Sequence, residues 1–195
     1  MYEERRRMVE VAHRAYWLRL TPGTSGNLSV RKAGYLLMTP TGSALGALSP
    51  EDIVEIPGKG RPSSEIRLHK ALFCRAKGVR AILHFHGTWS ILAAESHRFW
   101  RPAISLPELE GLTRTGCLPV VEPAPPGSQK LADRAALHYS PDAQGLLLKR
   151  HGAVTWGTTP EEALYMAETL EAAAHLDYWY RERGENRADS NTVGG

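Results

Sequence analysis

The sequence has few cysteines, little excess charge and no long apolar run, and each shortage excludes a class of protein. Cys74 and Cys117 are the 2 cysteines among 195 residues, too few for a disulfide scaffold, and they favour a reducing compartment. No apolar stretch approaches the roughly 20 residues that cross a bilayer. The charged N-terminus is followed by no apolar signal core. We therefore expect a cytoplasmic protein with no membrane partner.

The charge balance is close to neutral. Lys and Arg number 24 against 21 Asp and Glu, which gives a net charge of +3 with neutral histidines. This excess is too small to indicate nucleic-acid binding, and the 5 tryptophans form no aromatic and basic stripe. The hydrophobic content of 42% is ordinary for a globular protein. We expect one compact domain that does not bind nucleic acid.

Hydrophobic spacing divides the chain into alternating helices and short strands. Helices are expected near 3–20, 62–76, 88–94, 129–138 and 159–183, with a serine capping the second and Thr88 the third. Strands are expected at 27–31, 35–39, 53–56, 79–86, 118–121, 145–149 and 153–156, and 98–116 has no clear pattern. This mixture predicts an α/β or α+β fold with a central sheet. Residues 1–183 would form the single domain and 184–195 a flexible tail.

Two histidines separated by a single residue lie in an apolar strand. His84 and His86 flank Phe85, so strand alternation directs both imidazoles to one face. Such a pair suits zinc or another divalent transition metal, but it could also be bonded to backbone carbonyls or solvent. His151, where a strand breaks before Gly152, would complete a three-histidine site with an open coordination position. The spacing does not say whether the fold brings it there.

Glu65 is the candidate acid/base. We expect it in the first turn of its helix, where the helix dipole also favours a carboxylate for purely structural reasons. His69 lies one turn further along on the same face. It could orient the carboxylate or serve only in packing.

Three short loops, at 24–27, 41–43 and 63–64, supply hydroxyls and backbone N–H groups. The third precedes a helix, where the N–H groups and the dipole bind anions well. Together the loops could surround a phosphate. Individually, each is compatible with an ordinary turn or cap.

Six blocks of sequence occur in the order seen in the class II aldolase/adducin family. They are Thr-Ser-Gly-Asn-Leu-Ser at 24–29, Thr-Pro-Thr-Gly at 39–42, Pro-Glu-Asp-Ile-Val at 50–54, Pro-Ser-Ser-Glu at 62–65, His-Phe-His at 84–86 and His-Gly at 151–152. The chain resembles this family from about residue 8 to 180. The resemblance implies an α/β fold, a three-layer αβα arrangement with a central mostly antiparallel sheet. It also implies a homotetramer with active sites at subunit interfaces.

The resemblance further implies a role for each matching residue. His84, His86 and His151 would be the ligands of Zn²⁺, or of another divalent metal such as Mn²⁺ or Co²⁺, and Glu65 would be the catalytic acid/base. The substrate phosphate would be held by Gly26, Asn27, Thr41, Gly42, Ser63 and Ser64.

The implied activity is that of a zinc-dependent aldehyde-lyase, a carbon–carbon lyase. Such an enzyme would cleave a small ketose phosphate to dihydroxyacetone phosphate and an aldehyde through a zinc-stabilised enediolate. The same metal site could instead serve a decarboxylase of a 3-oxo sugar-acid phosphate, a ketose-phosphate dehydratase or a 4-epimerase. A non-catalytic binding domain like that of adducin is the alternative from another class.

One segment departs from the family's aldolases. Fuculose-phosphate aldolases carry a proline–tyrosine pair after the strand near residue 120, and the tyrosine serves as proton donor. Here Glu122 and Pro123 are followed by Ala124 and Pro125, so Glu122 or a tyrosine of the C-terminal helix substitutes, or the reaction differs. Residues 41–46 and 87–88 are more similar to the decarboxylase, whereas 63–65 are more similar to the aldolases.

Overall fold

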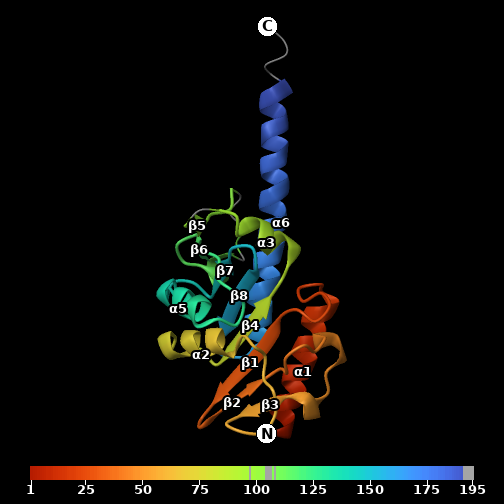
Figure 1. Ribbon diagram of the computed structural model, residues 1–195. Coiled ribbons are helices and arrows are strands. Elements are labelled where there is room, and N and C mark those ends of the chain that lie inside the picture. The colour runs from red at the N-terminus through yellow and green to blue at the C-terminus, as the bar shows by residue number, and fades with distance from the viewer. Residues whose placement is uncertain (97, 104–106, 108, 191–195) are drawn as a thin grey trace.

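The computed structural model describes residues 1–96, 98–103, 107 and 109–190, and of residues 184–190 only the backbone. One sheet runs through it. The strand order is β3-β2-β1-β4-β8-β7-β6-β5 (Figure 1). The strands are β1 (Asn27–Lys32), β2 (Tyr35–Met38), β3 (Val54–Ile56), β4 (Ala81–Phe85), β5 (Phe99–Trp100), β6 (Leu118–Val121), β7 (Gly145–Leu148) and β8 (Gly152–Gly157). Neighbouring strands are antiparallel except for the parallel pair β6 and β7.

Helices cover both faces of this sheet. They are α1 (Tyr2–Trp17), α2 (Ile66–Arg75), α3 (Thr88–Ala93), α4 (Leu109–Leu112), α5 (Gln129–Leu137) and α6 (Pro160–Ser190), with short 3₁₀ turns η1 (Leu45–Ala47) and η2 (Pro50–Asp52). Helices α1, α3, α4 and α6 contact one another or the sheet on one side, and α2 packs on α5 on the other (Figure 1). The three-layer αβα fold with a mostly antiparallel sheet is therefore confirmed.

The two faces of β4 belong to different cores. Leu83 and Phe85 are fully buried in the core formed with α1 and α6. Ile82 is buried in the second core, which contains residues of α2 and α5. Because side chains alternate along a strand, His84 lies on the α2/α5 side of the sheet with Ile82. The strand thus carries its histidine toward the start of α2.

Several element boundaries differ from the predictions. Helix α2 begins at Ile66 and its N-cap is Glu65 rather than a serine, because the Ser63 hydroxyl accepts the N–H of Glu65 in the preceding turn. Gly87, not Thr88, is the N-cap of α3. The segment without a predicted pattern contains β5 and α4.

The last helix is longer than predicted. Helix α6 continues to Ser190, beyond residue 183, where the end was expected. Gly184 does not end the helix, because one glycine costs a helix only about 1 kcal/mol relative to alanine. A flexible tail stays a prediction for residues 191–195, which lie outside the described residues.

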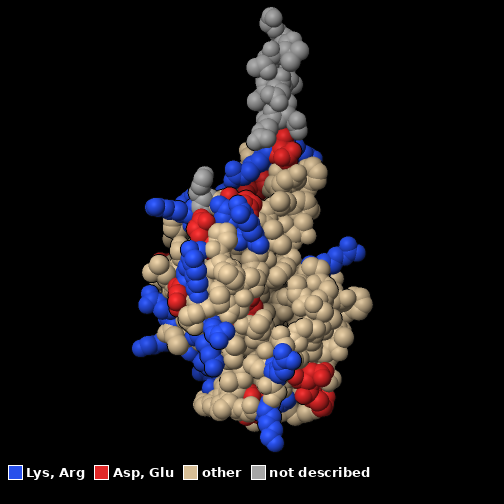
Figure 2. Space-filling model, in the orientation of Figure 1, with Lys and Arg blue, Asp and Glu red and all other residues tan. Residues whose placement is uncertain are grey.

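Charge is spread over the surface in small groups. Figure 2 shows Lys and Arg along the flank that carries α2 and α5, interrupted by Asp and Glu, and a mainly uncharged area around the end of α1. In the described part of the chain, no helix combines the length and apolar character needed to cross a membrane.

Candidate metal centre

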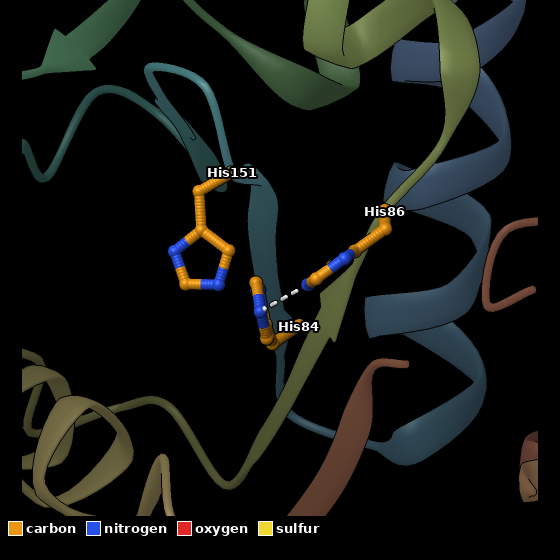
Figure 3. A group of neighbouring side chains, drawn as sticks. All are labelled: His84, His86 and His151. Atoms are coloured by element: carbon orange, nitrogen blue, oxygen red, sulfur yellow. Dashed lines mark hydrogen bonds between the residues drawn. The ribbon is translucent and has the colours of Figure 1, made fainter. Parts of the chain in front are cut away.

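Three histidines converge at one end of the central strands. His84 lies in β4, His86 follows its last residue, and His151 lies in the turn between β7 and β8. Figure 3 shows the three rings directed toward one another. The ring centroids are 4.8 Å apart for His84 and His86, 4.8 Å for His84 and His151, and 5.0 Å for His86 and His151. One ring nitrogen from each lies within 4.8 Å of the others.

His84 is the most firmly held of the three. Its backbone pairs with Asn27 of β1 on one side and Val154 of β8 on the other. Its Nδ1 donates a hydrogen bond to the carbonyl of Ala153 at 2.9 Å. This bond leaves the Nε2 lone pair directed into the cluster, as a metal ligand requires.

The tight turn between β7 and β8 positions His151. Arg150 adopts a positive φ of 57°, and the N–H of His151 donates to the carbonyl of Leu148 at 3.0 Å. A Cβ at Gly152 would lie 2.2 Å from the carbonyl oxygen of Phe85. Only glycine permits this approach of the turn to the end of β4, so Gly152 brings His151 beside the histidine pair.

Burial keeps the three imidazoles neutral. It lowers the pKa of His84 well below its usual value, His86 and His151 lower that pKa further, and the Ala153 carbonyl opposes the change. Burial also lowers the pKa of His86. The pKa of His151 falls to about 4, through burial first and the nearby His86 second. Metal binding requires neutral imidazoles, and the fold maintains this form at neutral pH.

The donor set fits a divalent transition metal. His84 Nε2 lies 2.9 Å from His86 Nε2, and because the His84 proton is on Nδ1, its Nε2 lone pair is available to a cation. His151 Nδ1 is buried and has no hydrogen-bond partner in the described part of the chain. Three neutral imidazoles, each with a ring nitrogen within 4.8 Å of those of the other two, suit Zn²⁺, Mn²⁺ or Co²⁺.

Glu65 lies beside this cluster. Its Oε1 is 3.9 Å from His151 Nε2 and accepts the backbone N–H of Gly127 at 2.8 Å. The side chain is 6% exposed, and Oε2 is buried with no hydrogen-bond partner among the described residues. Burial raises the pKa of Glu65, and the Gly127 N–H partly opposes that rise. A carboxyl group with a raised pKa and a free oxygen is suited to exchange a proton.

The side chain of His69 forms no hydrogen bond with the carboxylate of Glu65. It is fully buried, and its Nδ1 lies 2.6 Å from the hydroxyl of Ser29 in β1. Burial lowers its pKa to about 3. The side chain therefore joins α2 to the sheet, which leaves the Glu65 oxygens to Gly127 and to the cluster.

The first small-polar loop reaches the histidines directly. Asn27 is opposite His84 in the pairing of β1 with β4, and its Oδ1 is buried with no hydrogen-bond partner among the described residues. A Cβ on Gly26, whose φ is +74°, would lie 2.8 Å from the carbonyl oxygen of His84 and 2.4 Å from Thr21 Cγ2. Gly26 and Asn27 thus pack on the backbone of the buried histidine.

The other two loops lie side by side. The N–H of Ser63 donates to the Thr39 carbonyl at 3.0 Å, and the N–H of Thr41 donates to the Arg61 carbonyl at 3.1 Å. Ser63 is buried next to Glu65, whereas Thr41, Gly42 and Ser64 are exposed. Their described backbone contacts connect Thr41 to the 61–63 segment rather than to the histidines.

Sequence reasoning missed Gly127. Its N–H is the hydrogen-bond donor to Glu65, and a Cβ there would lie 2.9 Å from the carbonyl oxygen of Ser64. The Pro-Pro-Gly run at 125–127 signalled a turn. Nothing in that run indicates which carboxylate the turn approaches.

The contacts of Glu122 and of Tyr178, two expected substitutes for the missing tyrosine, are with residues other than the three histidines. The side chain of Glu122 is 62% exposed, with Lys149 Nζ 4.0 Å from its Oε1. Tyr178 of α6 packs against Trp89, with ring centroids 5.3 Å apart. A second proton donor is therefore not identified by these contacts.

The family model for the Class II Aldolase and Adducin N-terminal domain matches residues 6–178. The chain belongs to the class II aldolase/adducin family. This match includes Glu65 and all three histidines.

Individual members of the class II aldolase/adducin family align along nearly the whole chain. An L-fuculose phosphate aldolase of Methanococcus maripaludis is 32% identical over 175 residues, covering 87% of this chain and 93% of its own. A 3-oxo-tetronate 4-phosphate decarboxylase of Escherichia coli K12 is 31% identical, covering 92% and 88%. The crystal structure of L-fuculose-1-phosphate aldolase from Thermus thermophilus has a TM-score of 0.76 at 28% identity, covering 90% and 93%.

Proposed function

We propose that this protein is a metal-dependent carbon–carbon lyase acting on a small phosphorylated sugar. The observation that carries the proposal is the convergence of three neutral imidazoles on a buried carboxylate, with His151 Nε2 3.9 Å from Glu65 Oε1. His84, His86 and His151 would hold Zn²⁺ or a similar cation. Membership of the class II aldolase/adducin family supports the same chemistry.

Glu65 would transfer the proton. A divalent cation held by the three imidazoles supplies Lewis-acid polarisation of a substrate carbonyl and stabilises the negative charge that develops there. Gly127 donates to Oε1 and so fixes the carboxyl plane, which leaves Oε2 to take a proton from substrate or return it. The raised pKa of Glu65 brings its proton affinity closer to what a general acid/base needs near neutral pH.

The small-polar loops would bind the substrate phosphate. Asn27 and Ser63 are buried beside the histidines and Glu65, whereas exposed hydroxyl and N–H groups come from Thr41, Gly42 and Ser64. Gly26 would let its loop lie against the His84 backbone. Holding the phosphate end fixes the distance from the reacting carbon to the metal site, which lowers the entropic part of the barrier.

The preferred reaction is retro-aldol cleavage of a ketose phosphate to dihydroxyacetone phosphate and an aldehyde. Similarity to L-fuculose phosphate aldolases supports it. Decarboxylation of a 3-oxo sugar-acid phosphate is the second candidate, supported by a decarboxylase relative of comparable identity and by the absence of tyrosine after Pro123. In either reaction a bond to the carbon beside the ketone breaks, and its electron pair moves toward the ketone oxygen.

We further propose a homotetramer in the cytoplasm, with active sites at subunit interfaces. Large exposed apolar side chains support association between copies: Trp17 is 76% exposed and Trp179 50%. Trp17 is the last residue of α1, and Figure 2 shows a mainly uncharged area around that end of the helix. The cytoplasmic location is supported by Cys74 and Cys117, which are both free thiols.

A product assay tests the proposed reaction. The zinc-loaded and the chelator-stripped protein would each be given L-fuculose 1-phosphate or 3-oxo-tetronate 4-phosphate, and dihydroxyacetone phosphate would be measured with a coupled reductase. We expect zinc-dependent product from one substrate, with an aldehyde identifying the aldolase and CO₂ the decarboxylase. Fully zinc-loaded protein that releases dihydroxyacetone phosphate from neither substrate would count against both reactions.

A further inference from the structure

The backbone that carries His86 is held from outside the sheet. Strand β4 ends at Phe85, so His86 lies just beyond the regular ladder that holds His84. Its N–H donates to the carbonyl of Leu20 at 2.8 Å. On its other side the chain continues through Gly87 directly into α3.

Helix α3 begins without a capping side chain of its own. Its N-cap is Gly87, which has no side chain to accept the first N–H groups. Backbone donors in a first helical turn have no partner within their helix and need one from elsewhere. The turn after His86 therefore depends on a distant residue for its hydrogen bonds.

Glu171 of α6 provides these acceptors. Its Oε1 accepts the N–H of Trp89 at 2.9 Å, and its Oε2 accepts the N–H of Ser90 at 3.0 Å. The Ser90 hydroxyl, on a fully buried side chain, donates to the same Oε2. A carboxylate bound through both oxygens at the positive end of a helix is a strong, directional contact.

The same carboxylate also touches the residue bonded to His86. A Cβ built on Gly87 would lie 2.2 Å from Glu171 Oε2 and 2.8 Å from Ser90 Oγ. Since three donors fix the carboxylate, it cannot move aside. Gly87 therefore lies directly against the carboxylate of Glu171. Because Gly87 follows His86 in the chain, the position of Glu171 constrains the path of the backbone at His86.

We propose that Glu171 is a positioning residue for the metal site, which sets the orientation of the His86 imidazole through Gly87 and the start of α3. The inference rests on the proposed function in taking His86 as a metal ligand. Glu171 makes its contacts on the α1/α6 side of the sheet, opposite Glu65. It would act on the metal site only through the backbone.

The test compares Glu171→Gln with Glu168→Gln. Glutamine keeps the size of the side chain, but in either orientation of the amide its NH₂ group faces a backbone N–H donor, that of Trp89 or that of Ser90. Glu168 lies one turn earlier on α6 and bonds Arg14 of α1 at 3.1 Å, so its variant controls for loss of charge from the same helix. The Zn²⁺ dissociation constant is measured by competition with a chelating dye, and the visible absorption of the Co²⁺-loaded protein reports ligand geometry.

We expect Glu171→Gln to weaken Zn²⁺ binding about tenfold, in the range of residues that orient metal ligands, and to shift the Co²⁺ absorption bands. Glu168→Gln should match the wild type in both. Glu171→Asp keeps the charge but shortens the reach, and it gives the same test if the glutamine variant does not fold. A lowered Tm with unchanged Zn²⁺ affinity and Co²⁺ spectrum would overturn this inference but leave the proposed metal site intact. A wild-type protein that binds no Zn²⁺ would overturn the inference and the proposed metal site together.

Discussion

The Nε2 of His151 and the Oε1 of Glu65 are 3.9 Å apart, although the two residues lie far apart in the sequence. Glu65 is the N-cap of α2, and His151 lies in the turn between β7 and β8. The pair joins a group suited to proton transfer to a group suited to metal binding. Substitutions at His84 and at Glu65 should separate these two roles.

Replacing His84 should abolish metal binding. The imidazole is buried between its Ala153 hydrogen bond and the other two rings, so His84→Ala removes the most firmly oriented of the three nitrogen ligands. We expect Zn²⁺ affinity to fall by more than about 100-fold, because partners that only orient a ligand account for about 10–100-fold. Zinc per chain after dialysis is the measurement. His138→Ala, on a histidine at the end of α5, should retain zinc; equal zinc in both variants would contradict the assignment.

Replacing Glu65 should separate catalysis from metal binding. Glu65→Gln preserves the volume and an oxygen to accept the Gly127 N–H, but it cannot carry the transferred proton. Turnover should fall by about 10²–10⁴-fold, the usual contribution of a general acid/base, with zinc content unchanged. Steady-state kinetics on zinc-loaded protein measures this. Near-wild-type kcat would exclude Glu65 as the proton carrier.

The stability of the metal-free protein should fall in acid partly because of His69. Burial lowers the pKa of His69 from 6.5 to about 3, so between these values the unfolded chain binds a proton that the folded chain does not. As the pH falls through this window, His69 should lower the free energy of unfolding by about 1.4 kcal/mol per pH unit.

Urea unfolding at pH 4 to 8 checks this effect in the wild type and in His69→Gln. The variant should lose that part of the slope below about pH 6, even though losing the Ser29 contact lowers its stability at neutral pH. Parallel pH profiles for the two proteins would show that His69 takes up its proton in both states alike.

A methyl group at Gly26 should be far more damaging than one at Gly23. Both glycines have positive φ, +74° and +63°, but a Cβ at Gly23 meets nothing within 4 Å, whereas one at Gly26 meets Thr21 and the His84 carbonyl. Gly23→Ala should cost about 1 kcal/mol of backbone strain. Gly26→Ala should cost about 1–3 kcal/mol more, from overpacking. Denaturant midpoints measure the difference, and equal costs would mean that the close approach is relieved by a small movement.

Local patterns in the sequence predicted much of the fold. Alternation along β4 correctly directs His84 to the face opposite Phe85, and the boundaries of β6 were predicted without error. These features depend on a few adjacent residues, which is why periodicity finds them. The caps of α2 and α3 were mispredicted. The Ser63 hydroxyl is used in the turn before α2, and the first N–H groups of α3 are accepted by Glu171 on a distant helix, which local sequence does not indicate.

The spacing of residues in the sequence does not by itself predict the candidate metal site. His151 reaches the pair because β8 lies between β7 and β4 in the sheet, and this order cannot be read from residue spacing. The roles of the residues in the six sequence blocks came from the family resemblance and stay predictions. Gly127 was missed because a backbone N–H has no sequence signature. Its contact with Glu65 depends on the loop between β6 and α5 lying beside the start of α2.

The most direct test of the proposed chemistry is proton exchange on dihydroxyacetone phosphate in heavy water, followed by NMR. It needs no knowledge of the second product. The zinc-loaded wild type should exchange one of the two C3 protons stereospecifically, and the chelator-stripped protein, His84→Ala and zinc-loaded Glu65→Gln should exchange neither at a comparable rate. Undiminished exchange after verified removal of zinc, or from Glu65→Gln, would contradict the account of this site.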